Sequence, residues 1–160
     1  MNTCFNYLLF PFSILYRFII LFRNFCYDKK LIKANQLPCD VISIGNIGFG
    51  GTGKTPTVLY LCKMLQENKK KDIAILSRGY KRNTSGTVLV SKGNGPLKNW
   101  QAVGDESFMM AQKTKNIPIV VDSNRYRGGK FLIKNFNSKV IILDDGFQHR
   151  SLSRNLDIVL

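Results

Sequence analysis

Short apolar runs alternate with amphipathic stretches along most of this chain. The runs are short and continuous, which predicts strands buried on both faces of a sheet, at 41–44, 72–77, 117–122 and 139–145. The stretches between them predict helices at 57–65, 104–111 and 124–134. A weaker β-prone run at 87–90 is followed by a glycine-containing loop at 92–98. Because strands that alternate with helices form parallel βαβ units, the pattern predicts an α/β fold with a mostly parallel sheet flanked by helices.

The first 27 residues have a different pattern. They hold nine of the eighteen aromatic residues, and no acidic residue precedes Asp28. Six apolar positions alternate steps of four and three, which places them on one side of a helix: Leu8, Phe12, Leu15, Ile19, Phe22 and Cys26. Arg17 falls on the opposite side, and Pro11 and Pro38 are expected to bracket the helix.

Three interpretations of this helix stay open. An amphipathic helix in a membrane interface is favoured, because aromatic rings suit the headgroup region and basic residues attract anionic lipid. A spanning helix would bury Arg17 near its middle, at a cost of roughly 2.5–3.5 kcal/mol. A helix packed on a soluble core is the third, whereas a secretory signal is disfavoured because no charged leader or small-residue cleavage site is present. We therefore expect a membrane-associating segment at 1–37 and a core at 38–160.

A phosphate-binding loop motif joins the first strand to the next helix. Its octamer fits GxxxxGK[ST] and consists of Gly48, Phe49, Gly50, Gly51, Thr52, Gly53, Lys54 and Thr55. Glycines let several backbone N–H groups point at one anion, Lys54 reaches the β and γ phosphates, and Thr55 offers its hydroxyl to Mg²⁺. The motif predicts a P-loop NTPase-like core that binds ATP and Mg²⁺.

Paired carboxylates end the last long apolar run. Asp144 and Asp145 follow Leu143 directly, and ligands of open α/β sheets gather at the carboxyl ends of strands. A carboxylate there can hold a nucleotide-bound Mg²⁺ directly or through water. We therefore expect Asp144 to approach Thr55, although an aspartate that merely ends a strand is the alternative.

Charge and cysteine content narrow the choice of partners. The formal net charge of +14 raises nucleic acid as a partner, but the basic residues are scattered and form no aromatic-interleaved stripe. Anionic lipid is the other candidate partner, an ordinary solvated basic surface is the alternative for each cluster, and no nucleic acid is expected. Four separated cysteines and a single histidine suggest neither a zinc site nor a disulfide framework.

Five short blocks in the chain carry a family resemblance. They are Ile44-Gly45-Asn46, the loop Gly48–Thr55 with Pro56, Ser77-Arg78-Gly79-Tyr80, Gly104-Asp105-Glu106, and Asp144-Asp145-Gly146-Phe147-Gln148-His149-Arg150. Together they resemble the tetraacyldisaccharide 4'-kinase family, the lipid A kinases of Gram-negative bacteria, from about residue 10 to the last residue. The resemblance implies transfer of the γ-phosphate of ATP to the 4'-hydroxyl of a tetraacyldisaccharide 1-phosphate, forming lipid IVA.

The resemblance also implies roles for individual residues. Lys54 would neutralise charge on the transferred phosphoryl group, Thr55 and Asp144 would hold the metal, and Asp145 would support the metal or its waters. Asp105 would accept the proton of the sugar hydroxyl, with a plain helix N-cap as the alternative. The substrate's phosphate or sugar would contact Glu106, Arg78, Tyr80 and Arg125, with an exposed surface role as the alternative for the last three. Gln148 and His149 would orient the metal carboxylates.

The same resemblance places the protein at the cytoplasmic face of the bacterial inner membrane. Its expected partners are the lipid disaccharide and the membrane surface, and no obligate protein partner is inferred. A membrane-associated nucleotide-binding switch or ATPase without lipid kinase activity is the alternative, and a basic ATPase acting on nucleic acid is a third. Family members are about twice as long, and 156–160 looks like the middle of a strand. We therefore expect a fold that is incomplete at the carboxyl end, either a fragment or a truncated gene product.

Overall fold

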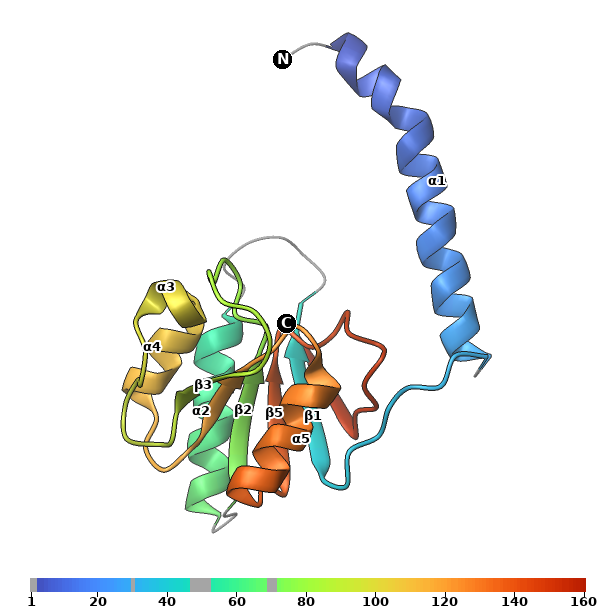
Figure 1. Cartoon of the computed structure of the whole chain (residues 1–160). Coiled ribbons are helices and arrows are strands. Elements are labelled where there is room, and N and C mark those ends of the chain that lie inside the picture. The colour runs from blue at the N-terminus through green and yellow to red at the C-terminus, as the bar shows by residue number, and fades with distance from the viewer. Residues whose placement is uncertain (1–2, 30, 47–52, 69–71) are drawn as a thin grey trace. The chain divides into compact units, whose positions relative to one another are not determined.

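The computed structural model describes residues 3–29, 31–46, 53–68 and 72–160, and gives only the backbone for residues 3–12. Figure 1 shows the whole chain. The chain divides into two compact units, Met1–Ala34 and Asn35–Leu160. The first contains one long helix, and the second contains every strand of the sheet. Each unit is described by itself.

The second unit is built on one six-stranded sheet. Its strands are β1 (Asp40–Gly45), β2 (Ile73–Ser77), β3 (Val88–Ser91), β4 (Ile119–Val121), β5 (Val140–Asp144) and β6 (Leu156–Val159). Their spatial order is β3-β4-β2-β5-β1-β6, and only the edge strand β3 runs antiparallel to its neighbour. The mostly parallel sheet predicted from the sequence is therefore confirmed.

Helices cover both faces of this sheet (Figure 1). They are α2 (Lys54–Glu67), α3 (Trp100–Val103), α4 (Asp105–Lys113) and α5 (Arg125–Phe136). The first and third pack on one face and α5 packs on the other. The sequence pattern predicted α2, α4 and α5 but missed α3, because a single turn of helix is too short to show a period.

Burial on both faces explains why the central strands are continuous apolar runs. In β2, Ile73 and Ile75 face the core under α2 and α4, whereas Ala74 and Leu76 face the core under α5. β5 alternates in the same way, and none of its residues is exposed. Such strands leave polar residues only at their ends, where the backbone leaves the sheet.

The helix of the first unit, α1 (Thr3–Asp28), is amphipathic over its described side chains. At 3.6 residues per turn all but one of its exposed large hydrophobic side chains fall on one side. They are Ile14, Leu15, Phe18, Ile19, Leu21, Phe22 and Phe25, whereas the exposed Tyr16 lies off this stripe. This stripe is wider than the predicted face, of which Leu8 and Phe12 have side chains outside the described residues. Arg17 lies on the other side, as predicted.

The boundaries of α1 correct one expectation. The helix runs through Pro11 and ends at Asp28, well before Pro38, so neither proline brackets it. A proline inside a helix removes one backbone hydrogen bond and can kink the helix without ending it. Among the helices in the described part of the chain, none combines the length and hydropathy that crossing a membrane requires.

Candidate active site

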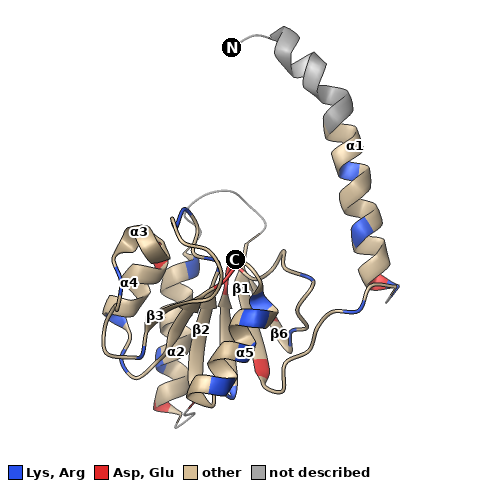
Figure 2. Ribbon diagram, viewed as in Figure 1, with Lys and Arg blue, Asp and Glu red and all other residues tan. Residues whose placement is uncertain are grey.

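The carboxyl ends of three adjacent strands form the floor of the candidate site. β2, β5 and β1 are neighbours and end at Ser77, Asp144 and Gly45, with Asn46 directly after β1. Side chains at these positions therefore share one edge of the sheet. Figure 2 shows acidic positions at this edge and basic positions at the start of α5.

Lys54 links the start of α2 to two of these strand ends. Its ammonium nitrogen donates to Asn46 Oδ1 at 3.0 Å and to Asp145 Oδ1 at 3.1 Å. The Lys54 side chain is about one-fifth exposed, whereas that of Asp145 is half exposed. The amine thus points across the strand ends, where the β and γ phosphates of a nucleotide would lie in a P-loop protein.

The described part of the phosphate loop has the required backbone. Gly53 adopts a left-handed conformation, with φ of 80°, immediately before α2. No atom lies within 4 Å of a methyl group built there, so it is the backbone angle rather than space that favours glycine. Thr55 is buried in the first turn of the helix. Gly48, Phe49, Gly50, Gly51 and Thr52, also predicted to bind phosphate, lie outside the described residues.

Asp144 is buried and only half satisfied. Its Oδ2 accepts a hydrogen bond from Ser77 Oγ at 2.9 Å, whereas its Oδ1 has no hydrogen-bond partner among the described residues. Burial raises the pKa of this carboxyl, and the negative charge of Asp145 adds to the increase. A buried oxygen without a partner is costly, so its retention is typical of a position reserved for a ligand.

The chain turns sharply after β5 and lies against β1. A methyl group on Gly45 would come within 2.4 Å of Phe147 Cβ, and one on Gly146 within 2.8 Å of Ser43 Oγ. Asp145 itself has a positive φ of 53°, which costs free energy for a residue other than glycine. The strained turn aims the Asp145 carboxylate at Lys54.

The start of α4 brings a second pair of carboxylates toward the strand ends. Burial, followed by the charges of Asp144 and Asp105, raises the pKa of Glu106, so Glu106 lies within electrostatic reach of Asp144. The N-cap is Gly104, and the Asp105 carboxylate accepts from the N–H of Glu106. The alternative that Asp105 is itself the N-cap is therefore wrong. Gly104 is required because a side chain there would meet the Tyr80 carbonyl at 2.8 Å.

Arg125 is buried at the start of α5, not exposed. Its Nη1 donates to the Asp122 carbonyl at 2.7 Å, and its Nε has no hydrogen-bond partner within the ranges that the structure describes. Burial, followed by the charge of Arg78, lowers the pKa of Arg125 to about 10, so the guanidinium stays charged at neutral pH. The negative charges of Asp144 and Asp145 partly oppose this decrease in the pKa of Arg125.

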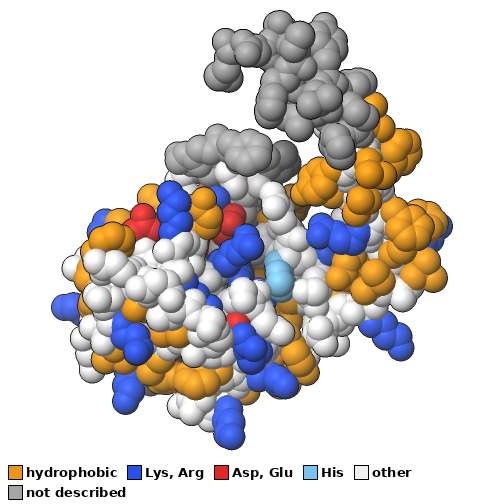
Figure 3. All heavy atoms as spheres, turned by 45° about the horizontal axis from the view of Figure 1, so that its top comes forward, with side chains coloured by type: hydrophobic (Ala, Val, Ile, Leu, Met, Phe, Trp, Pro, Cys, Tyr) orange, Lys and Arg blue, Asp and Glu red, His pale blue; other side chains and the backbone are white. Residues whose placement is uncertain are grey.

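Arg78 and Tyr80 are both exposed on the loop after β2. The Tyr80 ring carries the ammonium of Lys81 at 5.4 Å from its centroid, a cation–π contact. Figure 3 turns this end of the sheet toward the reader, and acidic and basic side chains lie together on it. Gln148 is also exposed, whereas His149 is half-buried, with Nε2 2.9 Å from Ser151 Oγ.

Three residues of the site were not assigned roles from the sequence. Ser77 holds Asp144, Asn46 holds Lys54, and Asp122 holds the start of α5 through bonds to Asn124 and Arg127. Each is a polar residue at the carboxyl end of an apolar run. A polar residue at the carboxyl end of a predicted strand is therefore the sequence signal from which these three residues could have been predicted.

These residues define a class of protein. A lysine at the start of the helix after β1, an acidic strand end beside it and a mostly parallel sheet form the core of a P-loop nucleotide-binding protein. Within the described ranges, no group of three or more His, Cys, Asp and Glu side chains could hold a metal ion alone. Such a core instead shares its Mg²⁺ with the phosphates of the nucleotide.

Comparisons with known proteins identify the family within this class. The family model described as tetraacyldisaccharide-1-P 4'-kinase matches residues 5–160, so the chain belongs to that family. The tetraacyldisaccharide 4'-kinase of Aquifex aeolicus is 47% identical over 152 residues, which cover 95% of this chain and 47% of that protein. The enzyme of Halothermothrix orenii is 42% identical over 99% of this chain and 42% of its own length.

A solved structure agrees with both the fold and the family. The crystal structure titled as the "apo" form of LpxK from Aquifex aeolicus in complex with ATP matches with a TM-score of 0.87 and 46% sequence identity. The match covers 94% of this chain and 47% of that one. The chain thus spans about half the length of the curated relatives it matches, and the resemblance stated from sequence blocks is confirmed.

Proposed function

We propose that the full-length gene product transfers the γ-phosphate of ATP to the 4'-hydroxyl of a tetraacyldisaccharide 1-phosphate, forming lipid IVA. The observation that carries this proposal is the set of Lys54, Asp144 and Asp145 at the strand ends of a chain that belongs to the 4'-kinase family. Phosphoryl transfer depends mainly on positioning and on stabilising charge, and these residues supply both.

Each side chain has a distinct task in this proposal. Lys54 exchanges its bond to Asp145 for the β and γ phosphates and stabilises charge on the group in transfer. Asp105 accepts the proton of the sugar hydroxyl, and Glu106 beside it contacts the substrate. Arg125 and Arg78 balance the phosphate charges, and Tyr80 contacts the substrate from the loop after β2.

The residues at the strand ends fit a magnesium ion. The unpartnered Oδ1 of Asp144 is an anionic oxygen of the kind that Mg²⁺ prefers, and the Thr55 hydroxyl comes from the neighbouring helix start. When bound, the ion neutralises charge on the β and γ phosphates. Asp145, released from Lys54, supports the waters around it.

The kinase proposal is tested by label transfer. The full-length protein is incubated with γ-labelled ATP, Mg²⁺ and the disaccharide lipid, and the Lys54→Ala variant is expected to lose transfer by at least about 100-fold. Lys63→Ala is the matched control, because Lys63 lies on the same helix in an exposed pair with Glu67. Undiminished transfer by Lys54→Ala would contradict the proposal. Hydrolysis of ATP without labelled lipid would favour a nucleotide switch.

We also propose that residues 1–37 associate with the cytoplasmic face of the inner membrane, while 38–160 form the kinase core. Support comes from the exposed apolar stripe of α1 and from basic residues such as Arg17 and Arg23 on its other side. The lipid acceptor stays in a bilayer, so an enzyme acting on it must work at that surface.

Vesicle sedimentation tests this placement. Phe22→Glu puts a charge into the apolar stripe and is expected to weaken binding to anionic vesicles by at least about tenfold, because a buried aromatic ring contributes about 1.5–3 kcal/mol. Tyr16→Glu, on the polar side of α1, is the matched control and is expected to change binding less. Equal losses for the two variants would argue against an interfacial helix of this orientation.

A further inference from the structure

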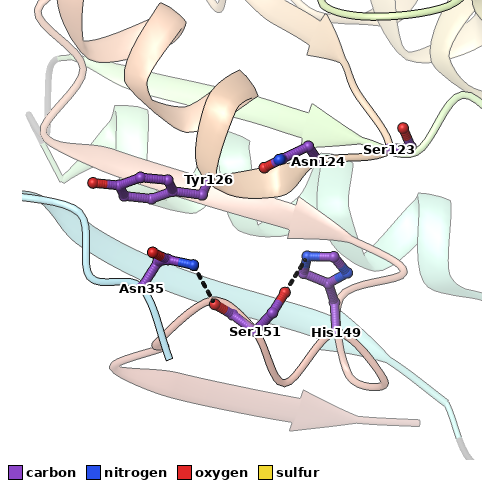
Figure 4. Close-up of a pocket in the computed structure, with 6 residues that line it drawn as sticks. All are labelled: Asn35, Ser123, Asn124, Tyr126, His149 and Ser151. Carbon is purple, nitrogen blue, oxygen red and sulfur yellow. Dashed lines mark hydrogen bonds between the residues drawn. The ribbon is translucent and has the colours of Figure 1, made fainter. Parts of the chain in front are cut away.

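A polar pocket of about 390 Å³ lies between α5 and the loop after β5 (Figure 4). Its lining consists of Asn35, Ser123, Asn124, Tyr126, His149 and Ser151. Ser123, Asn124 and Tyr126 form the wall at the start of α5, and Asn35, His149 and Ser151 form the opposite wall. None of these residues has been assigned a contact with substrate above.

The wall opposite α5 is held together by hydrogen bonds. Asn35 N–H donates to the Ser151 carbonyl at 2.9 Å, and Ser153 N–H donates to the Asn35 carbonyl at 2.8 Å. The Asn35 side-chain amide also donates to the Ser151 carbonyl, and Ser151 Oγ pairs with His149 Nε2. The lining is therefore positioned before any ligand arrives, which lowers the entropy cost of binding.

The chemistry of the lining selects a class of ligand. Two amides, two hydroxyls, an imidazole and a phenol line the pocket, without lysine, arginine, carboxylate or aliphatic side chains. An acyl chain would find no apolar wall, and a phosphate would find no cation among these residues. The Lys130 ammonium covers one face of the Tyr126 ring, 4.7 Å from its centroid. Neutral groups that both donate and accept, beside the other face of Tyr126 and the imidazole of His149, match the hydroxyl groups and the C–H face of a sugar ring.

The pocket also adjoins the candidate active site. Arg125, which feels the charges of Asp144 and Asp145, lies in the chain between Asn124 and Tyr126. His149 follows Asp145 by four residues in the turn that leaves β5. A volume of about 390 Å³ is at the small end of ligand sites, which suits one ring.

We propose that this pocket binds one sugar ring of the acceptor, and the inference rests on the proposed kinase function. The ring is held by hydrogen bonds to Ser151, His149 and Asn35 and lies against Tyr126. The hydroxyl to be phosphorylated then points over the start of α5 toward Lys54 and the carboxylates at the strand ends. The pocket raises affinity for the acceptor and leaves nucleotide affinity unchanged.

Steady-state kinetics of the full-length protein test the assignment, with the disaccharide lipid in mixed micelles. Ser151→Ala, which removes one neutral hydrogen bond to the ring, and Tyr126→Leu, which removes the flat face against which the ring lies, are each expected to raise KM for the disaccharide about three- to tenfold. KM for ATP is expected to stay within twofold. Ser153→Ala, an exposed serine of the same loop, is the matched control and is expected to change neither constant. An increase in KM for ATP alone would place the nucleotide base in the pocket and overturn the inference, as would unchanged constants for both variants.

A binding measurement separates this inference from the kinase proposal. The imidazole NMR signals of His149, assigned with His149→Gln, are expected to shift when soluble, deacylated glucosamine disaccharide 1-phosphate is added, and not with AMP. If the full-length protein transfers no phosphate, the kinase proposal fails, while a shift specific to the sugar still supports the pocket. If the His149 signals do not shift with the sugar, although an unchanged unfolding temperature shows that the protein is folded, the assignment of the pocket to a sugar ring is wrong.

Discussion

Asp122 and Asp144 occupy equivalent places in this fold and have opposite surroundings. Each is a fully buried carboxylate at the carboxyl end of a parallel strand, Asp122 just after β4 and Asp144 at the last position of β5. Asp122 accepts hydrogen bonds from Arg127, from Thr87 and from the N–H of Asn124. Asp144 accepts one from Ser77, and in the described part of the chain its second oxygen has no partner.

The pKa values of the two carboxyls move in opposite directions. Burial alone would raise both, and for Asp144 it does. For Asp122 the bonds from Arg127, Thr87 and Asn124 together outweigh burial and lower the pKa. A buried carboxylate with all its partners is part of the scaffold, whereas one that lacks a partner is open to a ligand.

The largest effect is expected for Asp144→Asn, which removes the charge and keeps the shape. Transfer by the full-length protein should fall by more than about 100-fold, because a charge that stabilises the metal-bound phosphates is lost. The fold should be at least as stable as before. Because the raised pKa means that the folded chain binds this proton more tightly than the unfolded chain, the ionised carboxyl costs stability at neutral pH. Label transfer checks the predicted loss of activity, and urea unfolding of the same preparation checks the predicted stability. Loss of stability together with activity would place Asp144 in the scaffold.

The opposite result is expected for Asp122→Ala, which should destabilise the chain by about 2–4 kcal/mol in urea unfolding. Removing one partner of a buried ion pair is destabilising because the groups that bonded to it lose their partner. The expected loss stays below about 5 kcal/mol because Arg127 is half exposed and can be hydrated by water instead. Glu67→Ala breaks an exposed ion pair and is the control, expected to cost no more than about 0.5 kcal/mol. Equal stability of the two variants would show that Asp122 does not brace the start of α5.

The sequence predicted the positions of both aspartates and assigned a ligand to Asp144 alone, but it did not predict the difference in their hydrogen bonds. The runs at 117–122 and 139–145 both end in a carboxylate, and buried strands with polar ends give the same local pattern in each case. What separates them is tertiary: Thr87 reaches Asp122 from the edge strand region, and Ser77 reaches Asp144 from the neighbouring β2. Partners that distant in the chain leave no periodic signal.

Other features followed from the sequence only where a local rule applied. Apolar periods placed the strands and long helices, and the loop motif placed Gly53 in the tight turn before α2. The burial of Arg125 could not be predicted from the sequence, because arginine is normally exposed and only the packing of α5 on the sheet encloses it. The single-turn helix α3 and the N-cap at Gly104 could not be predicted either.

Acid titration should separate the two carboxylates further. The lowered pKa of Asp122 means that the folded chain binds fewer protons there than the unfolded chain. Its stabilising contribution is therefore complete above the ordinary aspartate pKa of about 3.9, declines as the pH falls below that value, and is lost below the folded pKa. In urea unfolding from pH 7 to pH 3, the stability difference between the wild type and Asp122→Asn should shrink toward the acid end. A difference that does not change with pH would mean that the charge of Asp122 contributes nothing.

The smallest effect is expected for Thr87→Val, which removes one of the hydrogen bonds to Asp122 and keeps the side-chain shape. The loss should be about 1–2 kcal/mol in urea unfolding, because hydrogen bonds to charged groups contribute more than neutral ones, while Arg127 and Asn124 still satisfy the carboxylate. Combined with Asp122→Asn, the substitution should cost less than the sum of the two single losses, since the bond it removes is already weakened. Full additivity would contradict a direct bond between Thr87 and Asp122. The same double-mutant cycle with Asp144→Asn should be additive, because Asp144 draws its hydrogen bond from Ser77, at the end of a different strand.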